Sequence, residues 1–295
     1  VDSLIRYEEW ISSNYIFEET ILIDTGYPFY ISGFAELYRG LSRYVSDDYL
    51  IKYNQILSYL IEIQNNWMWV GDYGYHPHYN SFFAQNFLDA YLYTKNQTYL
   101  DAFTSTVEAF RNFYDGEKIY ISENSNLYAF TMISTALSMN LINSTYVSLG
   151  LNLVNYSLKF FNESTFEWFN PLNPKYSEGY DGRAAYYQLL SLLWIMMHNK
   201  EIKVAFPQLH SNLTSIVNSS IPIVEKYLLD AGTFYYLPDV VDYTESAGAT
   251  VYGFTLFDKY FNTSHADAIN NGLHTIIERQ RDDGAYYKTN DSEVV

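Results

Sequence analysis

The sequence contains no cysteine, so neither a disulfide framework nor a cysteine-ligated metal site can contribute to its fold or function. Charge is scarce as well, because 17% of the 295 residues are charged, below the usual share of about 25%. Only 17 residues are Lys or Arg against 34 Asp or Glu, which gives a net charge of −17 and argues against nucleic-acid binding. The longest apolar run, 189–197, is much shorter than the roughly 20 residues that span a bilayer.

Polarity comes instead from 32 tyrosines and from many Asn, Ser and Thr residues. The chain has more Asn-x-Ser/Thr sequons than its composition would give by chance, and they indicate a secreted glycoprotein with N-linked glycans. This composition resembles that of cell-surface glycoproteins of thermoacidophilic archaea. We therefore expect an extracellular or cell-surface location, with any signal peptide already removed before Val1. The candidate glycosylation sites are Asn96, Asn143, Asn155, Asn162, Asn212, Asn218, Asn262 and Asn290.

Two kinds of helical segment alternate along the chain. One kind has a single apolar face, and the other is apolar on almost all sides after a polar start, which is typical of a buried helix. We call the first kind outer and the second kind inner. The outer segments are 3–13, 47–64, 97–113, 147–161, 211–229 and 264–280, and Pro222 is expected to kink the fifth. The inner segments are 27–44, 78–94, 123–141, 181–198 and 243–260.

The joints between these segments repeat too. Inner-to-outer joints are short and rich in residues that cap helix starts. Outer-to-inner joints are longer, and their polar turns followed by aromatic residues predict β-hairpins. The predicted hairpin joints are 64–75, 114–120, 162–169, 230–236 and 281–287.

Together these patterns predict one all-α domain over 1–295, an α/α toroid of about eleven helices with short β-hairpins in the outer-to-inner joints. The last joint should lead to a sixth inner helix past Val295, so we expect an incomplete six-hairpin ring that is a fragment of a longer chain.

In such a ring the starts of all inner helices, with their partial positive charges, would meet at one face. Tyrosines, tryptophans and carboxylates gathered there would suit a polysaccharide or glycan, because aromatic rings stack on sugars and acids bind hydroxyl groups. Glu123 also lies at this face, where it is most simply a first-turn acid. The predicted substrate-binding residues are Tyr75, His76, His78, Asn126, Arg183, Tyr187 and Asp242, and the predicted catalytic residues are Asp72, Glu178, Asp181 and Glu245.

Two stretches resemble parts of α/α-toroid carbohydrate-active enzymes: six-hairpin glycosidases and the heparinase II/III- and alginate-type lyases. YSEGYDGRAAYYQLLSLLW, at 176–194, is similar to a lyase pattern of an acidic turn followed by paired tyrosines. SENSNLYAFTMISTAL, at 122–137, stands where those lyases carry Asn-Asn-His, but only Asn126 matches and the histidine is missing. The resemblance implies an extracellular carbohydrate-active protein.

Hydrolysis is favoured over lyase chemistry. A hydrolase needs two carboxylates, one as a proton donor and one that activates water or attacks the sugar. A lyase would use Tyr187 or His78 as the base, with Arg183 and Asn126 on the substrate carboxylate. A tyrosine, with an ordinary pKa of about 10, is a poor base in an acidic medium.

Each of these residues also has a simpler structural role. Asp181 would cap its helix, Arg183 would pair with a neighbouring acid, and Glu245 would be a first-turn acid.

The His76-Pro-His78 spacing lacks a third metal ligand, and no Gly-rich phosphate loop is present, so we expect no metal and no cofactor. The alternative function is a non-catalytic structural or adhesive glycoprotein of a cell surface or filament, and sugar binding without turnover is a further one.

Overall fold

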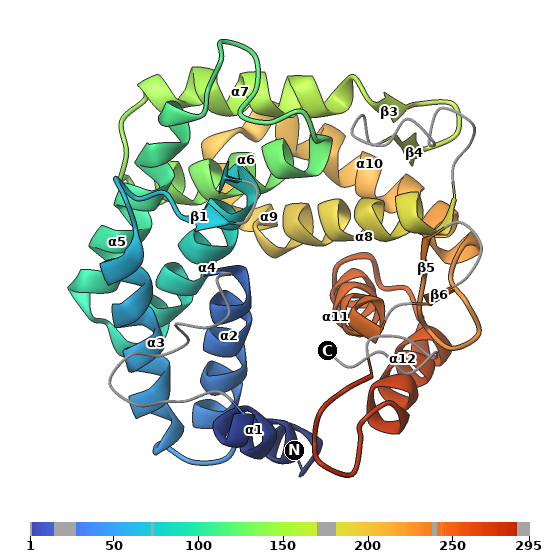
Figure 1. Ribbon diagram of the computed structural model, residues 1–295. Helices are drawn as coiled ribbons and strands as arrows, with labels where there is room; N and C mark the ends of the chain where they lie inside the picture. Colours follow the sequence, from blue (N-terminus) through green and yellow to red (C-terminus); the bar gives the residue numbers. More distant parts are fainter. Residues whose placement is uncertain are drawn as a thin grey trace. The chain divides into compact units, whose positions relative to one another are not determined.

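The computed structural model describes residues 2–14, 28–71, 74–169, 181–237, 241–242 and 244–287, most of them in helices (Figure 1). The chain divides into two compact units, each described here by itself. The first unit is Val1–Tyr120 with Asp283–Ala285, and the second is Ile121–Asp282 with Tyr286–Val295. Each of the eleven helices expected from the hydrophobic periodicity is present.

Paired helices make up the first unit. The inner helices α2 and α4 pack against each other, and each contacts the outer helix that follows it. The Asn86 side chain of α4 is buried and donates a hydrogen bond to the Ser32 carbonyl oxygen of α2 at 3.2 Å, which fixes the two inner helices in register. The helices of the first unit are α1 (Asp2–Asn14), α2 (Pro28–Tyr44), α3 (Tyr49–Ile63), α4 (Pro77–Thr94), α5 (Gln97–Glu108) and the 3-10 helix η1 (Ala109–Asn112).

In the second unit α8 contacts two other inner helices, α6 and α11. Every residue of α6 from Glu123 to Ala136 is buried, whereas the outer helices α7, α10 and α12 each keep an exposed face. This contrast confirms the predicted alternation of inner and outer helices. The helices are α6 (Glu123–Ser138), α7 (Thr145–Leu158), α8 (Gly182–Met197), α9 (Asn199–Ala205), α10 (Pro207–Lys226), α11 (Thr244–Phe261) and α12 (Ala266–Glu278).

The short helix α9 was not predicted. The next helix, α10, starts at Pro207 and not at the predicted residue 211. Tertiary contacts explain why the helical chain is interrupted at His198 and again at Phe206. The buried His198 side chain hydrogen-bonds Thr135 of α6 at 3.0 Å, and the Phe206 ring packs against Phe130 with centroids 5.1 Å apart and the ring planes tilted by 46°. Pro207 then opens α10, since proline is favoured in the first turn of a helix. α10 is a single helix that runs through Pro222.

Four of the five predicted hairpin joints contain antiparallel pairing. Three are two-stranded sheets, and the fourth is a single bridge between Gln280 and Tyr286. The joint at 114–120 differs, because Asp115 accepts hydrogen bonds from the backbone amides of Glu117 and Lys118 and closes a turn without strands. The paired strands are β1 (Val70–Gly71) with β2 (Gly74–Tyr75), β3 (Phe161–Asn162) with β4 (Glu167–Trp168), and β5 (Tyr235–Leu237) with β6 (Val241–Asp242).

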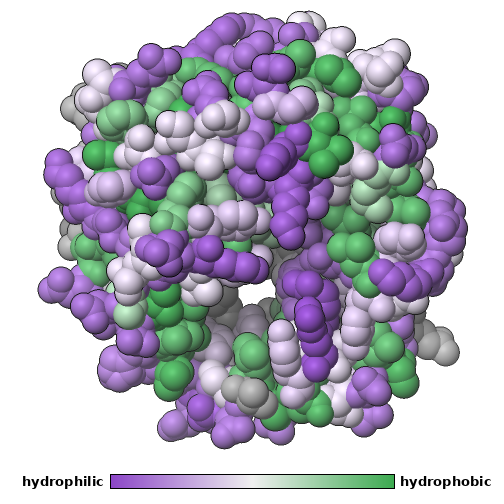
Figure 2. All heavy atoms as spheres, turned by 180° about the vertical axis from the view of Figure 1, so that it is seen from behind, coloured by the Kyte–Doolittle hydropathy of each residue, from purple (hydrophilic) through white to green (hydrophobic). Residues whose placement is uncertain are grey.

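Among the helices that the structure describes, none has the length and apolar character needed to cross a bilayer. Figure 2 shows one face of the molecule, on which hydrophilic residues are spread widely with hydrophobic ones between them.

Candidate active site

The starts of α6, α8 and α11 place two carboxylates beside two buried tyrosines in the second unit. We call Glu123, Tyr128, Tyr186 and Glu245 the carboxylate–tyrosine cluster. Tyr186 donates a hydrogen bond to Glu245 Oε1 at 2.9 Å, which joins α8 to α11. Tyr128 and Tyr186 are 3% and 4% exposed, so their hydroxyl groups lie where electrostatic interactions are only weakly screened.

Glu123 is the buried acid of the cluster. It is 1% exposed, and Oε2 has no hydrogen-bond partner within the described part of the chain. Burial raises the pKa of Glu123 to about 8, although hydrogen bonds from the backbone amides of Glu123 and Asn124 oppose the shift. The side chain therefore keeps its proton at neutral pH and can act as a proton donor.

Glu245 has the opposite environment, because it is exposed to solvent at the start of α11. Burial raises the pKa of the Tyr128 hydroxyl well above its usual value, and the charges of Glu123 and Glu245 raise it further. Both carboxylates therefore interact electrostatically with the Tyr128 hydroxyl group. A protonated and a solvent-accessible carboxyl group in such different environments are suited to divide acid and base roles.

The buried tyrosines are poor candidates for a catalytic base. Burial raises the pKa of Tyr186 well above its usual range, and the neighbouring charge of Glu245 adds to the shift. Tyr187, predicted to bind substrate, lies beside this pair, with the Arg183 guanidinium carbon 5.6 Å from its ring centre. Arg183 and Tyr187 lie on α8 and Glu245 on α11, two helices that contact each other.

Two other predicted site residues make bonds within their own helix starts. Asp181, predicted to be catalytic, caps α8 by accepting a hydrogen bond from the Ala184 amide at 3.0 Å. Asn126, predicted to bind substrate, is fully buried and donates to the Ser122 carbonyl oxygen at 2.6 Å. The simpler capping role of Asp181 is the one that the structure contains.

Loss of this cap gives a test of that role. Asp181→Ala should lower the free energy of unfolding by about 1 kcal/mol, because the Ala184 amide loses its acceptor. Asp181→Asn should retain most of the stability, since its side-chain oxygen can accept the same bond. Urea unfolding of both variants measures the difference, and an equal loss in the two would contradict the capping role.

The predicted histidines belong to the first unit. His76 and His78 form a ring cluster with Tyr79 and Tyr120, with centroids between 4.1 and 6.1 Å apart. Burial lowers the pKa of His78 to about 3, and His76 adds to the shift, so the His78 ring is neutral and only weakly basic at neutral pH. The described residues contain no group of three metal-ligating side chains.

Four predicted residues fall where the structure gives no side-chain description. Asp72 and Glu178 lie outside the described residues. Tyr75 belongs to β2 and Asp242 to β6, and only their backbone pairing is described. The carboxylate–tyrosine cluster is therefore argued from described side chains alone.

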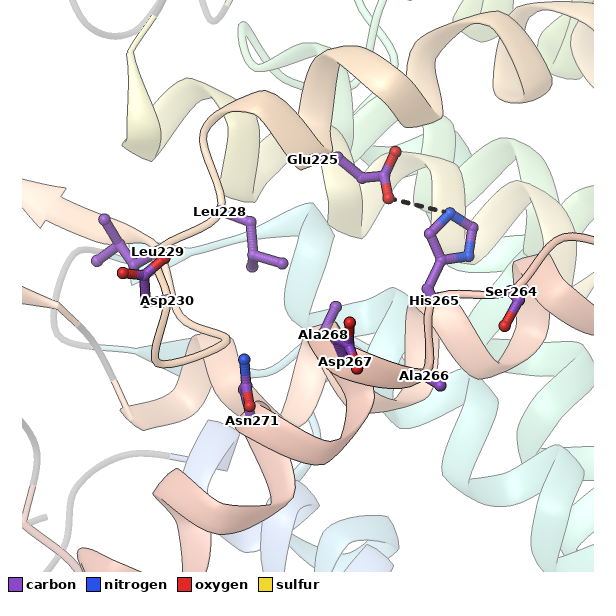
Figure 3. Close-up of a pocket in the computed structure, with 10 residues that line it drawn as sticks. All are labelled: Glu225, Leu228, Leu229, Asp230, Ser264, His265, Ala266, Asp267, Ala268 and Asn271. Carbon is purple, nitrogen blue, oxygen red and sulfur yellow. Dashed lines mark ion pairs between the residues drawn. The ribbon is translucent and has the colours of Figure 1, made fainter.

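A separate pocket of about 400 Å³ lies between the end of α10 and the start of α12 (Figure 3). His265 reaches Glu225 across it, with Nε2 3.2 Å from Oε1, and its Nδ1 hydrogen-bonds the Asp258 carboxylate. The Asp258 carboxylate also accepts from the His265 backbone amide at 2.9 Å. These bonds fasten the joint between α11 and α12 to the end of α10.

No known family profile matches this sequence, and no curated protein matches it either. Solved structures do match. A polysaccharide lyase has a TM-score of 0.71 and 11% identity, covering 100% of this chain and 88% of its own. A glycosyl hydrolase of family 88 from Bacteroides vulgatus has a TM-score of 0.68 and 8% identity, covering 100% and 90%. A family 76 α-mannanase from Bacteroides thetaiotaomicron has a TM-score of 0.66 and 12% identity, covering 98% and 87%.

The chain has an α/α-toroid fold. The fold class expected from the alternating helices is confirmed, and so is the resemblance in fold to toroid carbohydrate-active proteins. At identities of 8 to 12% the similarity concerns the fold alone, so the chemistry has to be argued from the residues of the cluster.

Glu123 is the functional candidate that sequence reasoning undervalued. A signal was present, since Glu123 is the only charged residue between 123 and 138 in a segment predicted to be buried. At the start of α6 this lone acid is shielded from solvent, and its pKa rises accordingly. Spacing along the chain shows the acid but not how deeply it is buried.

Proposed function

We propose that this protein is a carbohydrate-active enzyme, specifically a glycoside hydrolase, acting at the carboxylate–tyrosine cluster on a polysaccharide or glycan. The observation that carries the proposal is that a buried, protonated Glu123 and an exposed Glu245 both interact electrostatically with Tyr128. The toroid fold supports it, since the solved structures with this fold include a family 76 α-mannanase and a family 88 glycosyl hydrolase. An extracellular location is also proposed, on the sequons alone.

The roles follow from the two environments. Glu123, whose pKa of about 8 keeps it protonated, would donate a proton to the leaving glycosidic oxygen. Glu245, oriented by the hydrogen bond from Tyr186, would activate water or attack the anomeric carbon. Because Glu123 is 1% exposed, reaching the substrate requires its side chain to turn outward at the first turn of α6.

The same geometry disfavours lyase chemistry. A lyase removes a proton from carbon and needs a base that is unprotonated at working pH. Tyr128 and Tyr186 hold their protons more tightly than ordinary tyrosines, because burial raises the pKa of both. The pKa of His78, about 3, makes it a weak base. Hydrolysis is therefore favoured over elimination.

A polysaccharide screen with a matched pair of variants tests the proposal. Purified protein is incubated with α- and β-linked polysaccharides in acidic and neutral buffers, and new reducing ends are measured. Glu245→Gln should lower kcat by about 10²–10⁴-fold, because the second carboxylate is lost. Glu278→Gln is the control, since Glu278 is an exposed residue of α12 paired with His274.

Each result of this screen decides the question. Reducing ends that appear without an unsaturated, ultraviolet-absorbing product support hydrolysis, and an unsaturated product would identify a lyase instead. Full activity of Glu245→Gln would overturn the role of this carboxylate. A protein that cleaves no substrate in the panel would favour the structural or adhesive glycoprotein.

A further inference from the structure

We propose that the folded protein carries N-linked glycans at its loop sequons, and that its helical sequons are closed to modification once the chain has folded. The described sequons divide into these two groups by the exposure of their hydroxyl residue, not by that of the asparagine. The loop sequons are those of Asn96, Asn143, Asn162 and Asn262, and the helical sequons are those of Asn155, Asn212 and Asn218.

The asparagine side chains alone do not separate the two groups. Six of the seven described sequon asparagines are exposed, and Asn162 in β3 is half-buried. None of the seven lies in an inner helix, where a glycan would have no solvent to occupy. This distribution agrees with surface modification, but it does not say which sites the folded chain can present.

In the loop sequons the hydroxyl residue is at the surface beside its asparagine. Thr145 donates to Asn143 Oδ1 from its backbone amide at 3.0 Å and also from its hydroxyl group. Ser164 does the same to Asn162 Oδ1, at 2.9 Å from the amide and 2.6 Å from the hydroxyl. Thus the asparagine oxygen is held by the chain, while the amide nitrogen is the atom to which a glycan bonds. The four hydroxyl residues Thr98, Thr145, Ser164 and Ser264 are all exposed.

In the helical sequons the hydroxyl group bonds to the protein backbone instead. Ser157, two residues after Asn155, is fully buried and donates to the Glu123 carbonyl oxygen at 2.8 Å. Ser220, two residues after Asn218, is fully buried and donates to the Phe166 carbonyl oxygen at 3.2 Å. Thr214 donates to the His210 carbonyl oxygen at 2.9 Å. A transferase that reads both residues of the motif could not reach the buried Ser157 and Ser220 without unfolding the helix, and at the half-buried Thr214 it would have to break the bond to His210.

The transfer itself requires a lipid-linked sugar phosphate or diphosphate and a membrane oligosaccharyltransferase. The asparagine amide nitrogen forms a bond to the anomeric carbon and loses one proton. The bond between that carbon and the phosphate oxygen breaks, and the lipid phosphate or diphosphate leaves.

Glycans at Asn143 and Asn262 would leave the carboxylate–tyrosine cluster uncovered. Asn143 follows the end of α6 and Asn262 follows the end of α11, whereas Glu123 and Glu245 lie at the starts of the same helices. With 16 residues in α6, the two ends are about 24 Å apart at about 1.5 Å per residue. Ser264, of the Asn262 sequon, lines the pocket of Figure 3 and is open to solvent.

The test compares folded and unfolded acceptor protein. The full chain, made in a host without the transferase and extended by an unstructured tail that carries one reporter sequon, is incubated with the transferase and its lipid-linked donor. Glycopeptide mass spectrometry then measures the occupancy of every site. In the folded protein we expect occupancy at the four loop sequons and none at the three helical ones, and denatured protein should gain the helical sites.

Two variants sharpen the result. Thr145→Ala should abolish the modification of Asn143, and Thr145→Ser should retain it, because only the second keeps a hydroxyl group. A modified reporter sequon with no modified loop sequon in the folded protein would overturn the proposal. Equal occupancy of loop and helical sites in the folded protein would also overturn it. Neither outcome bears on the proposed hydrolase, whose residues carry no sequon.

Discussion

Replacing Glu123 by glutamine is expected to abolish hydrolysis and, at the same time, to make the folded protein more stable at neutral pH. Burial raises the pKa of Glu123 from its ordinary value of 4.5 to about 8. Between these two pH values the folded protein holds a proton that the unfolded chain releases, so the free energy of unfolding falls as the pH rises. At pH 7 this lowers stability by on the order of 3 kcal/mol, and glutamine, which does not ionise, removes the effect.

The measurement is chemical unfolding of both proteins in acidic buffer, at about pH 4, and at about pH 7. The variant should gain stability over the native sequence at the higher pH, and lose this advantage at the lower pH, where Glu123 is protonated in both states. Glu278→Gln, at an exposed site, should show no comparable change. A stability difference that does not depend on pH would contradict the burial of an ionisable Glu123.

Activity gives the second readout of Glu123→Gln. Loss of the proton donor should lower kcat by about 10²–10⁴-fold, because glutamine cannot protonate the leaving oxygen. In the native sequence, activity should fall above about pH 8, as Glu123 loses its proton. A stable variant with undiminished activity would exclude Glu123 as the acid and leave its burial as a purely structural fact.

Gly232→Ala should be the most destabilising small substitution in the second unit, lowering the free energy of unfolding by about 3 kcal/mol or more. Gly232 has a φ of +70°, which alanine adopts only with strain. An added Cβ would lie 2.3 Å from the Gly272 amide nitrogen and 2.7 Å from its Cα. The loop after α10 would then have to move away from α12, because the obstacle is backbone and not a flexible side chain.

Two glycines act as controls for this substitution. Gly116 also has a positive φ, of +107°, but nothing lies within 4 Å of its added Cβ. Gly116→Ala should therefore show only the backbone cost, about 1–2 kcal/mol. Gly248, inside α11 and without neighbours, should gain up to about 1 kcal/mol on replacement by alanine. Thermal and urea unfolding compare the three variants. Equal losses of unfolding free energy at positions 232 and 116 would show that the close contact with α12 does not affect stability.

The helices could be predicted well because the burial of a helix shows in the hydrophobic pattern of its own residues. An inner helix such as α6 is apolar on nearly every side, and an outer helix shows a single apolar face, so each can be recognised in isolation. The helix α9 was missed because contacts of His198 and Phe206, the residues at its two ends, with the distant helix α6 separate it from α8 and α10. Such tertiary contacts leave no periodic signal in the chain.

The candidate site was predicted less completely than the fold. Glu245 and Tyr187 were expected at the inner-helix starts, and the structure places them beside the buried tyrosines. Asp181 was expected to be catalytic, although its offset of three residues from Ala184 already fits a capping bond. The special character of Glu123 comes from burial by neighbouring helices, which residue spacing does not reveal.

The hydrogen bond from Ser157 to the Glu123 carbonyl oxygen links an outer helix to the proposed proton donor. This bond helps α7 to hold the first turn of α6, which carries Glu123, in position. A substitution on α7 that removed this support would change how readily the acid turns toward a substrate, without touching the substrate at all. The outer layer of helices could therefore adjust the proposed chemistry from a distance.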